Sequence, residues 1–294
     1  MSQVFSLSYV LTTFNKFQYL QVTLPLLINA CKPDEEIVIV DGGSNDGSAG
    51  FLQDLFERCK IHQLISERDR GEAHGTNKGL LMAKGKLVKI ISDDDVYSYE
   101  NIQVCKNFML NNPDIDLLAT SGFYLNVLAR DKIKIHSNDQ LLAYQIWVHN
   151  KQPFLFTGLG IMLRRKSISL LGLFDSSYFI VDFEYSLRVT SGNAKLAWYS
   201  GYTFVNIINP SSNSHKHWIR LYNEKERLIK LYGLKSHFIG TRYVVMRSKL
   251  SLWVRSLFGK SRRMDPVEFD YRELVDRAQS HLKESSEKDT GKFF

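Results

Sequence analysis

Short apolar runs alternate with helical patterns along the first third of the chain. The runs are rich in β-branched and aliphatic residues and predict four strands, at Val4–Leu11, Glu36–Val40, Ile61–Ile65 and Lys86–Ile91. Between them, apolar residues recur at helical spacing, for example in Phe51–Cys59. Strand and helix in alternation are typical of a doubly wound α/β sheet. In such sheets, ligands bind outside the carboxyl ends of the strands.

Polar residues follow each predicted strand directly. Thr12 and Asn15 come after the first, and the segment Asp41–Ser48 comes after the second. Gly43 within that segment permits close approach of the backbone to a ligand. The third strand leads to Asp69–Gly71. The sequence therefore predicts a ligand site at this edge of the sheet.

Three consecutive carboxylates follow the fourth strand, at Asp93, Asp94 and Asp95. Two like charges about 4 Å apart repel by ~1 kcal/mol in water and by ~4 kcal/mol at an effective dielectric constant of 20. A divalent cation would relieve this repulsion, and Mg²⁺ is usually held by one or two carboxylates together with substrate phosphates. The alternative is a solvated acidic turn. The polar segments upstream favour the cation site.

Further along, Leu117–Val127 and the apolar region Pro153–Leu163 read as strands, and Arg164–Leu171 reads as a short helix. Asp182 and Glu184 then open another helix. Acids in a first helical turn are stabilised by the helix dipole alone. They are also suitable general bases, which take the proton of an attacking hydroxyl.

The ordered set of polar segments resembles glycosyltransferase family 2. The set comprises Thr12–Asn15, Asp41–Gly47, Asp69–Gly71 with Asn77–Gly79, and Ser92–Tyr97. Neither the dinucleotide-binding G-x-G-x-x-G nor the P-loop pattern is present. The resemblance runs from about Val4 to about Gly192. It implies a GT-A fold, in which a Rossmann-like mixed central sheet is flanked by helices, here followed by a C-terminal helical extension.

The resemblance also implies roles for individual residues. Asp41 matches the aspartate that binds the nucleobase, commonly uracil, and Asp95 matches the ligand of Mn²⁺ or Mg²⁺. Asp182 matches the catalytic base, with Glu184 as the second candidate, and His215 is a candidate late metal ligand. The residues expected around the nucleotide sugar are Thr12, Asn15, Asp41, Gly43, Arg70, Asn77, Lys78, Asp93 and Asp94. For His215, the alternative is a solvated loop position beside Lys216 and His217.

The net charge of +7 comes from one segment. Residues 242–263 hold seven basic residues and no acidic one, so the remaining 31 basic residues balance the 31 acidic ones. Apolar residues recur there at intervals of three and four, as in an amphipathic helix. Such a helix suits an anionic membrane surface or packs on the domain with its basic face in water. The two interpretations stay open.

The three cysteines do not form a disulfide or zinc pattern, and no run of about 18 apolar residues or cleavable leader is evident. We therefore expect a cytoplasmic protein, with peripheral membrane contact through residues 242–263 as an option. The expected domains are a GT-A domain at 1–210, with a nucleotide-binding half (1–97) and an acceptor half (98–210). Helices at 211–263 and a charged, partly disordered tail at 264–294 would follow.

The expected function is an inverting, metal-dependent glycosyltransferase. It would move a sugar from a nucleotide diphosphate donor, expected to be a UDP-sugar, to a hydroxyl of a glycan or polyprenyl-linked acceptor in cell-surface polysaccharide biosynthesis. One alternative is a nucleotidyltransferase acting on sugar phosphates, although the first polar segment lacks the glycines that such an enzyme needs. The other is a basic module that binds lipid or nucleic acid. The balanced charge outside residues 242–263 argues against nucleic acid.

Overall fold

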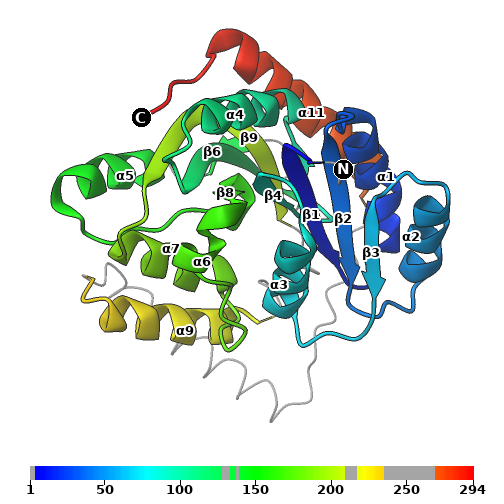
Figure 1. Cartoon of the computed structure of the whole chain (residues 1–294), viewed down its shortest axis with the longest axis horizontal. Coiled ribbons are helices and arrows are strands. Elements are labelled where there is room, and N and C mark those ends of the chain that lie inside the picture. The colour runs from blue at the N-terminus through cyan, green and yellow to red at the C-terminus, as the bar shows by residue number, and fades with distance from the viewer. Residues whose placement is uncertain (1–3, 128–132, 137–138, 209–216, 235–268) are drawn as a thin grey trace, which may run out of the picture.

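A mixed central sheet flanked by helices organises the molecule (Figure 1). The computed structural model describes residues 4–127, 133–136, 139–208, 217–234 and 269–294. Within this part, nine strands form one sheet in the order β3-β2-β1-β4-β8-β6-β9-β5, and β7 pairs with β6. The strands are β1 (Leu7–Thr13), β2 (Glu35–Asp41), β3 (Gln63–Ser66), β4 (Leu87–Ile91), β5 (Val96–Tyr97), β6 (Leu117–Asn126), β7 (Ile133–Ile135), β8 (Met162–Arg164) and β9 (Leu196–Ile208). The expected α/β architecture is confirmed.

The helices lie on both faces of this sheet. They are α1 (Phe17–Ala30), α2 (Ser48–Glu57), α3 (Glu72–Met82), α4 (Tyr99–Asn111), α5 (Asp139–Asn150), α6 (Ile168–Leu171), α7 (Val181–Ser191), α9 (Trp218–Leu231) and α11 (Tyr271–Lys288), with 3₁₀ turns η2 (Gly158–Gly160) and η3 (Arg165–Ser167). Strands β3, β2, β1 and β4 run parallel, whereas β8 is antiparallel to both β4 and β6. The sheet is therefore parallel on one side and mixed on the other.

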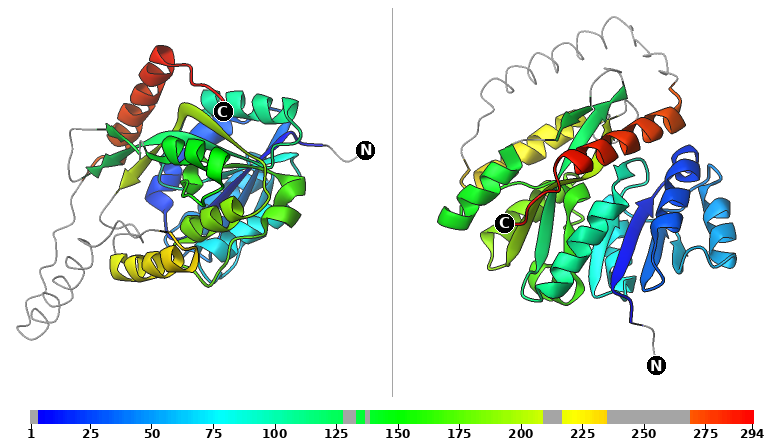
Figure 2. Two further views of the ribbon diagram at one scale, coloured as in Figure 1. Left: turned by 90° about the vertical axis from the view of Figure 1, so that its left-hand side faces the viewer. Right: turned by 90° about the horizontal axis from the view of Figure 1, so that it is seen from above.

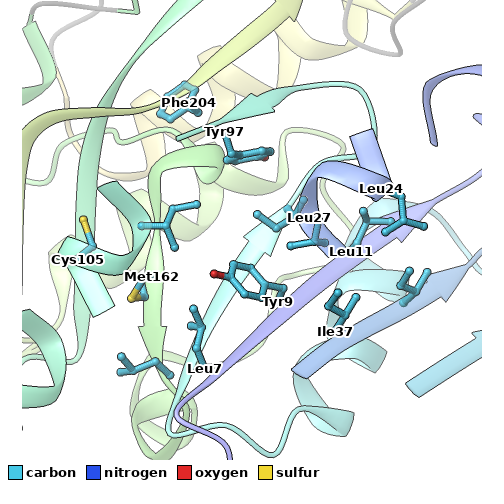
Figure 3. Packing of buried hydrophobic residues seen from close by; sticks show 14 of the residues in the cluster. Leu7, Tyr9, Leu11, Leu24, Leu27, Ile37, Tyr97, Cys105, Met162 and Phe204 are labelled. Carbon is cyan, nitrogen blue, oxygen red and sulfur yellow. The ribbon is translucent and has the colours of Figure 1, made fainter. Parts of the chain in front are cut away.

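The parallel strands are buried on both faces, which explains their continuous apolar runs. Leu7, Tyr9 and Leu11 point from β1 into a core shared with α1 and α4, part of which is shown in Figure 3. Val10 and Val38 point to the opposite face, where they pack with α3. Because helices cover both faces of these parallel strands, the polar side chains expected at the ligand site lie at the strand ends.

The region Pro153–Leu163 differs from the expected long strand. Only Met162–Arg164 forms a strand, and the turn η2 precedes it. The apolar residues here pack into the core without joining a sheet ladder: Phe154 and Phe156 are buried against the face that carries α5 and α7. Apolar content alone cannot separate a strand from a packed irregular segment.

The C-terminal segment also differs from expectation. Helix α11 was expected to be part of a charged tail, disordered from Lys283 onward, yet it continues to Lys288 and packs against β9, β5 and α1 (Figure 2). Its buried residues are Tyr271, Val275, Ala278 and Leu282, spaced as one helical stripe among many charged residues. Phe293 then stacks on Phe108 at 3.9 Å between ring centroids. The tail is a packed part of the fold.

The basic segment 242–263 lies outside the described residues, so both interpretations of it stay predictions. In the part of the chain that is described, no helix combines the length and apolarity needed to cross a bilayer.

Candidate functional site

The ends of three parallel strands place the predicted polar segments at one edge of the sheet. In the registers of the β1–β2 and β1–β4 ladders, Thr13 lies beside Asp41, and Leu11 lies beside Ile91. The segments that follow β1, β2 and β4 therefore leave the sheet side by side. Parallel strands bring their carboxyl ends together in this way, as the sequence predicted.

Lys16 and Thr13 hold the first two carboxylates of the acidic run. The Thr13 hydroxyl donates to Asp93 Oδ2 at 2.7 Å, and Lys16 Nζ lies 4.0 Å from Asp93 Oδ1. The Lys16 ammonium also forms a close ion pair with Asp94. The other oxygen of Asp94 accepts a hydrogen bond from the Ser92 hydroxyl. Asp94 keeps 16% of its side chain exposed, so its carboxylate remains accessible at this edge.

Asp95 is held by β9. Its Oδ1 accepts hydrogen bonds from the Ile207 amide at 2.7 Å and from Asn206 Nδ2 at 3.0 Å, both on β9. Only 4% of the residue is exposed. Burial, with the neighbouring Asp94 charge, raises the pKa of Asp95 to about 8. The role of Asp95 as a metal ligand stays a prediction. In this structure its Oδ1 also anchors the acidic run to β9.

Burial also governs Asp93. Its removal from water, reinforced by the charge of Asp94, raises the pKa of Asp93 to about 7, although Lys16 and the Thr13 hydrogen bond oppose the shift. A cation bound at the accessible Asp94 would therefore also stabilise the charged form of Asp93.

Asp41 is fully buried and already satisfied by the protein. Its carboxylate accepts from the Ser44 amide and hydroxyl and from the Ser66 hydroxyl, the last at 2.6 Å. These bonds shape the turn after β2, in which Gly43 takes a φ of +83°. A Cβ at Gly43 would also lie 3.1 Å from the Arg68 amide nitrogen. Asp41 and Gly43 therefore shape this segment, and nothing in the arrangement points Asp41 at a ligand.

Asn15 links the segments after β1 and β2. Its side-chain oxygen accepts from the Asn45 amide at 2.9 Å, and its own amide donates to the Ser44 hydroxyl at 2.8 Å. Asn15 adopts a left-handed φ of 53°, a conformation in which asparagine is more common than most residues. Asn15 thus positions the edge of the site.

Asp69 is a site residue that the sequence analysis did not single out. A Cβ built on Gly42 or on Gly75 would lie 2.9 Å from Asp69 Oδ2, and one on Gly75 would also meet the Thr12 methyl group at 3.1 Å. The carboxylate therefore lies between two glycines, beside Thr12. Its other oxygen accepts from the Gly71 amide. Three segments meet at Asp69, which only the fold reveals.

Four further residues were expected at the nucleotide, and each has a different partner: Thr12, Arg70, Asn77 and Lys78. The Thr12 hydroxyl lies 3.3 Å from that of Thr76. Arg70 is exposed, and its amide donates to His74 Nδ1. Asn77 instead binds the backbone of Phe174: its Nδ2 donates to the Phe174 carbonyl at 2.7 Å, and its Oδ1 accepts from the Phe174 amide at 2.9 Å. Lys78 forms an ion pair with Glu67 at 2.7 Å.

Asp182 lies in the first turn of α7, and its Oδ2 accepts a hydrogen bond from the Gly158 amide at 3.2 Å. Burial raises the pKa of Asp182 above that of an ordinary aspartate, although the Gly158 hydrogen bond and the nearby His136 oppose the shift. The His136 ring lies 3.3 Å from the Thr157 hydroxyl, which also contacts Gln140. Polar groups therefore surround the base candidate.

Glu184 is held differently. Both its oxygens bind Arg188, at 2.7 and 3.1 Å, and Arg188 in turn binds the carbonyl oxygens of Leu171 and Leu173. This pair ties α7 to the end of α6. Of the two acids, Asp182 is therefore the better candidate base.

Comparison with known sequences identifies the family of the chain. The sequence model described as glycosyl transferase family 2 matches residues 8–170, more than half of the chain. The chain belongs to glycosyl transferase family 2. Among the relatives of this family-2 chain, a glycosyltransferase of Haemophilus influenzae is 25% identical over 56% of this chain and 64% of the relative. A poly-β-1,6-N-acetyl-D-glucosamine synthase of Staphylococcus epidermidis is 29% identical over 32% of this chain and 23% of that protein.

Solved structures share the fold. Staphylococcus aureus TarS 1–349 in complex with UDP-GlcNAc matches 95% of this chain and 81% of that chain, with a TM-score of 0.60 and 15% identity. The mannosyltransferase PcManGT of Pyrobaculum calidifontis, in complex with GDP-Man and Mn²⁺, matches 98% of this chain and 88% of that chain, with a TM-score of 0.57 and 16% identity. The GT-A fold expected for this family-2 member is confirmed.

Glu72, at the start of α3, connects the two halves of the family-2 site. Its carboxylate interacts electrostatically with both Asp94 and Asp182. Crowding by the surrounding protein, followed by the negative charges of Asp182 and Asp94, raises the pKa of Glu72, although the residue as a whole is solvent-exposed. The acidic run and the base candidate therefore face a common region.

The donor set suits a hard divalent cation held partly by a ligand. Among the described residues, no group of three or more His, Cys, Asp or Glu side chains is arranged to hold a metal. One accessible carboxylate, Asp94, with Asp93 beside it, fits the pattern in which Mg²⁺ or Mn²⁺ takes one or two carboxylates and substrate phosphates. His215 lies outside the described residues. His217 precedes α9, and its ring packs edge-on against Phe179.

Proposed function

We propose that this chain transfers a sugar from a UDP-sugar to a hydroxyl group of a glycan or lipid-linked acceptor, with inversion at the anomeric carbon. The observation that carries the proposal is the acidic run after β4, in which Thr13 and Lys16 hold Asp93 and Asp94 beside the segments that follow β1 and β2. One carboxylate site for a cation and a separate accessible base are the two parts that such a transfer needs. Family membership supplies the reaction class.

Asp69 and Thr12 form the proposed nucleobase site. Uracil presents an N–H donor at N3, and the Asp69 carboxylate accepts such a bond between Gly42 and Gly75, where a Cβ would come within 2.9 Å of it. The absence of side chains at both glycines lets the backbone approach the carboxylate closely. We therefore assign to Asp69 the base contact first expected of Asp41.

Asp94 is the proposed metal ligand in place of Asp95, with Asp93 as its neighbour. A bound Mn²⁺ or Mg²⁺ neutralises charge that develops on the departing diphosphate. Lys16 would have to release Asp94 for the cation to bind it, because the two are in direct contact. Freed from Asp94, the ammonium remains at the same edge, near the diphosphate.

Asp182 is the proposed base. It accepts the proton of the acceptor hydroxyl while the oxygen attacks the anomeric carbon, and UDP leaves from the opposite face. Its raised pKa makes it a stronger base than an exposed aspartate, while the hydrogen bond from the Gly158 amide favours its charged form. Single displacement from one face inverts the configuration.

A thermal-shift screen of nucleoside diphosphates tests the function. The full chain is heated with UDP, CDP, GDP or ADP, each with and without Mn²⁺. A ligand that binds only the folded state raises the melting temperature in line with RT ln(1 + [L]/Kd). We expect the largest shift with UDP and Mn²⁺ together. The proposal would be contradicted if none of the nucleoside diphosphates raised the melting temperature. Release of pyrophosphate from UTP and a sugar phosphate would also contradict it, and would indicate nucleotidyl transfer.

A further inference from the structure

A lysine lies fully inside the core of the sheet. Lys89 is the middle residue of β4, on the face that also carries Leu87 and Ile91, and only 2% of it is exposed. Its ammonium lies 5.3 Å from the centroid of the Tyr97 ring, and Tyr97 and Cys105 mark this face in Figure 3. Burial lowers the pKa of Lys89 to about 7. An apolar residue would fill this position without the desolvation of a charge.

The ammonium of Lys89 binds a single turn of the chain. It donates to the Leu159 carbonyl, in a close contact, and to the Ile161 carbonyl at 3.2 Å. Both carbonyls belong to or directly follow η2, the turn that interrupts the expected strand. Both of these hydrogen-bond partners are backbone oxygens, so the ammonium holds the backbone of the turn in place.

The same turn contacts Asp182 on its other side. The Gly158 amide donates to Asp182 Oδ2, and a Cβ at Gly158 would lie 3.1 Å from the Cβ of Asp182. At the other end of η2, a Cβ at Gly160 would lie 2.7 Å from the Thr120 carbonyl oxygen. The turn is therefore packed closely on both sides, and a shift at Lys89 would be transmitted to the base.

We propose that Lys89 is a positioning residue for the reaction: by holding the Leu159 and Ile161 carbonyls it fixes η2, and η2 fixes the carboxylate of Asp182. This inference rests on the proposed function, in which Asp182 is the base. It connects β4, whose end carries the acidic run, to the base on α7. A displacement of reacting groups by about 1 Å can lower a rate by about 10²-fold, so a rigid support for Asp182 is functionally important.

The test compares Lys89→Met with Lys106→Met. Lys106 is also a buried lysine, but it pairs with Glu35 and contacts the Ser6 hydroxyl, in the half of the sheet away from α7. Both variants leave buried oxygen atoms without the donor that satisfied them, so both should unfold at a lower temperature. Lys89→Arg, which keeps the positive charge and hydrogen-bond donors, serves as the rescue variant.

Each variant is measured for UDP binding with Mn²⁺, for hydrolysis of UDP-GlcNAc or the UDP-sugar that binds best, and for the pH dependence of kcat. For Lys89→Met we expect UDP affinity within about twofold of wild type and kcat lower by about 10²-fold. The acidic limb of kcat should move to higher pH, because a displaced Gly158 amide no longer favours the charged form of Asp182. For Lys106→Met we expect the kcat of wild type and an acidic limb of the kcat profile at the same pH as in wild type.

Two outcomes would overturn the inference. One is a Lys89→Met enzyme with the kcat and pH limb of Lys106→Met; the other is an Arg variant that restores stability without restoring kcat. If Lys89→Met does not fold, Gly158→Ala, which presses on Asp182 without removing the ammonium, must show the same loss of kcat and shift of the limb. Asp182→Asn separates the two proposals: if it stays active, the assignment of the base fails, whereas if it is inactive and Lys89→Met is normal, only the role of Lys89 fails.

Discussion

The two halves of the sheet build their parts of the site in different ways. On the parallel side, the polar residues follow their strands within a few positions, as Asp94 follows β4. On the mixed side, Asp182 is held by Gly158, which lies 24 positions earlier in the chain on an irregular turn. The turn is itself held by Lys89 from the parallel side. The part of the site on the parallel side is thus local in sequence, and the part on the mixed side depends on contacts between distant segments.

A second lesson concerns which acids remain accessible. Asp41, Asp95 and Glu184 were expected to bind ligand or substrate, and each also makes hydrogen bonds or an ion pair within the protein. Asp94, which pairs with Lys16, keeps 16% of its side chain exposed. A position directly after a strand puts a residue at this edge of the sheet. Its hydrogen bonds and ion pairs within the protein then determine how available it is to a ligand.

The largest expected effect separates the two acids of α7. Asp182→Asn should lower kcat by about 10³-fold, within the range of about 10²- to 10⁴-fold for loss of a general base, while UDP affinity stays unchanged. Glu184→Gln should instead lower the melting temperature, because Arg188 loses a charged partner. Steady-state kinetics and thermal unfolding of both variants make the comparison. An active Asp182→Asn enzyme would remove the proposed base.

The next effect separates two neighbours in the acidic run. Asp94→Asn should weaken Mn²⁺-dependent binding of UDP by about 10²-fold, because the accessible oxygen loses its charge. Asp95→Ala should destabilise the fold by about 1–3 kcal/mol, since the Ile207 amide loses its acceptor. Calorimetric titration with UDP, with and without Mn²⁺, tests the first expectation. Equal metal dependence in wild type and Asp94→Asn would return the ligand role to Asp95.

Much of this outcome was predictable from the sequence, and the reasons for the rest are physical. The alternation of strands and helices and the position of the acidic run after β4 follow from local patterns, so they could be predicted. Asp182 was singled out through the family resemblance, and its role stays a prediction. Asp69 was missed because its importance comes from Gly42 and Gly75, which meet it only in the folded chain. The turn η2 and the helix α11 were misjudged because packing against β4 and β9 decides their structure, which periodicity over a short segment does not report.

A smaller effect concerns recognition of the base. Asp69→Ala should raise the Kd for UDP by about 10-fold to 10²-fold, the range for a hydrogen bond to a charged group. CDP is the matched control, because N3 of cytosine accepts a hydrogen bond and does not donate one. Its weaker binding should change little in the variant. If Asp69→Ala binds UDP normally and Asp41→Asn does not, the base contact belongs to Asp41 after all.

The smallest effect is a pH dependence. The base must be charged to accept a proton, and burial raises the pKa of Asp182, so activity should fall with decreasing pH at a midpoint above about 3.9, the value of an unperturbed aspartate. His136 lies close by, but burial lowers its pKa, which moves its titration away from the neutral range. This midpoint is measured from the dependence of kcat on pH at a saturating concentration of the UDP-sugar. A midpoint at or below that of a free aspartate would show that Asp182 does not control the rate.

The stereochemistry of the product tests the central claim most directly. When an α-linked UDP-sugar is turned over and the product is followed by proton NMR before mutarotation, one base acting opposite the diphosphate must give the β anomer. We predict β product first. Initial formation of the α anomer would require a second displacement or attack from the same face, and would contradict Asp182 as the single base of this site.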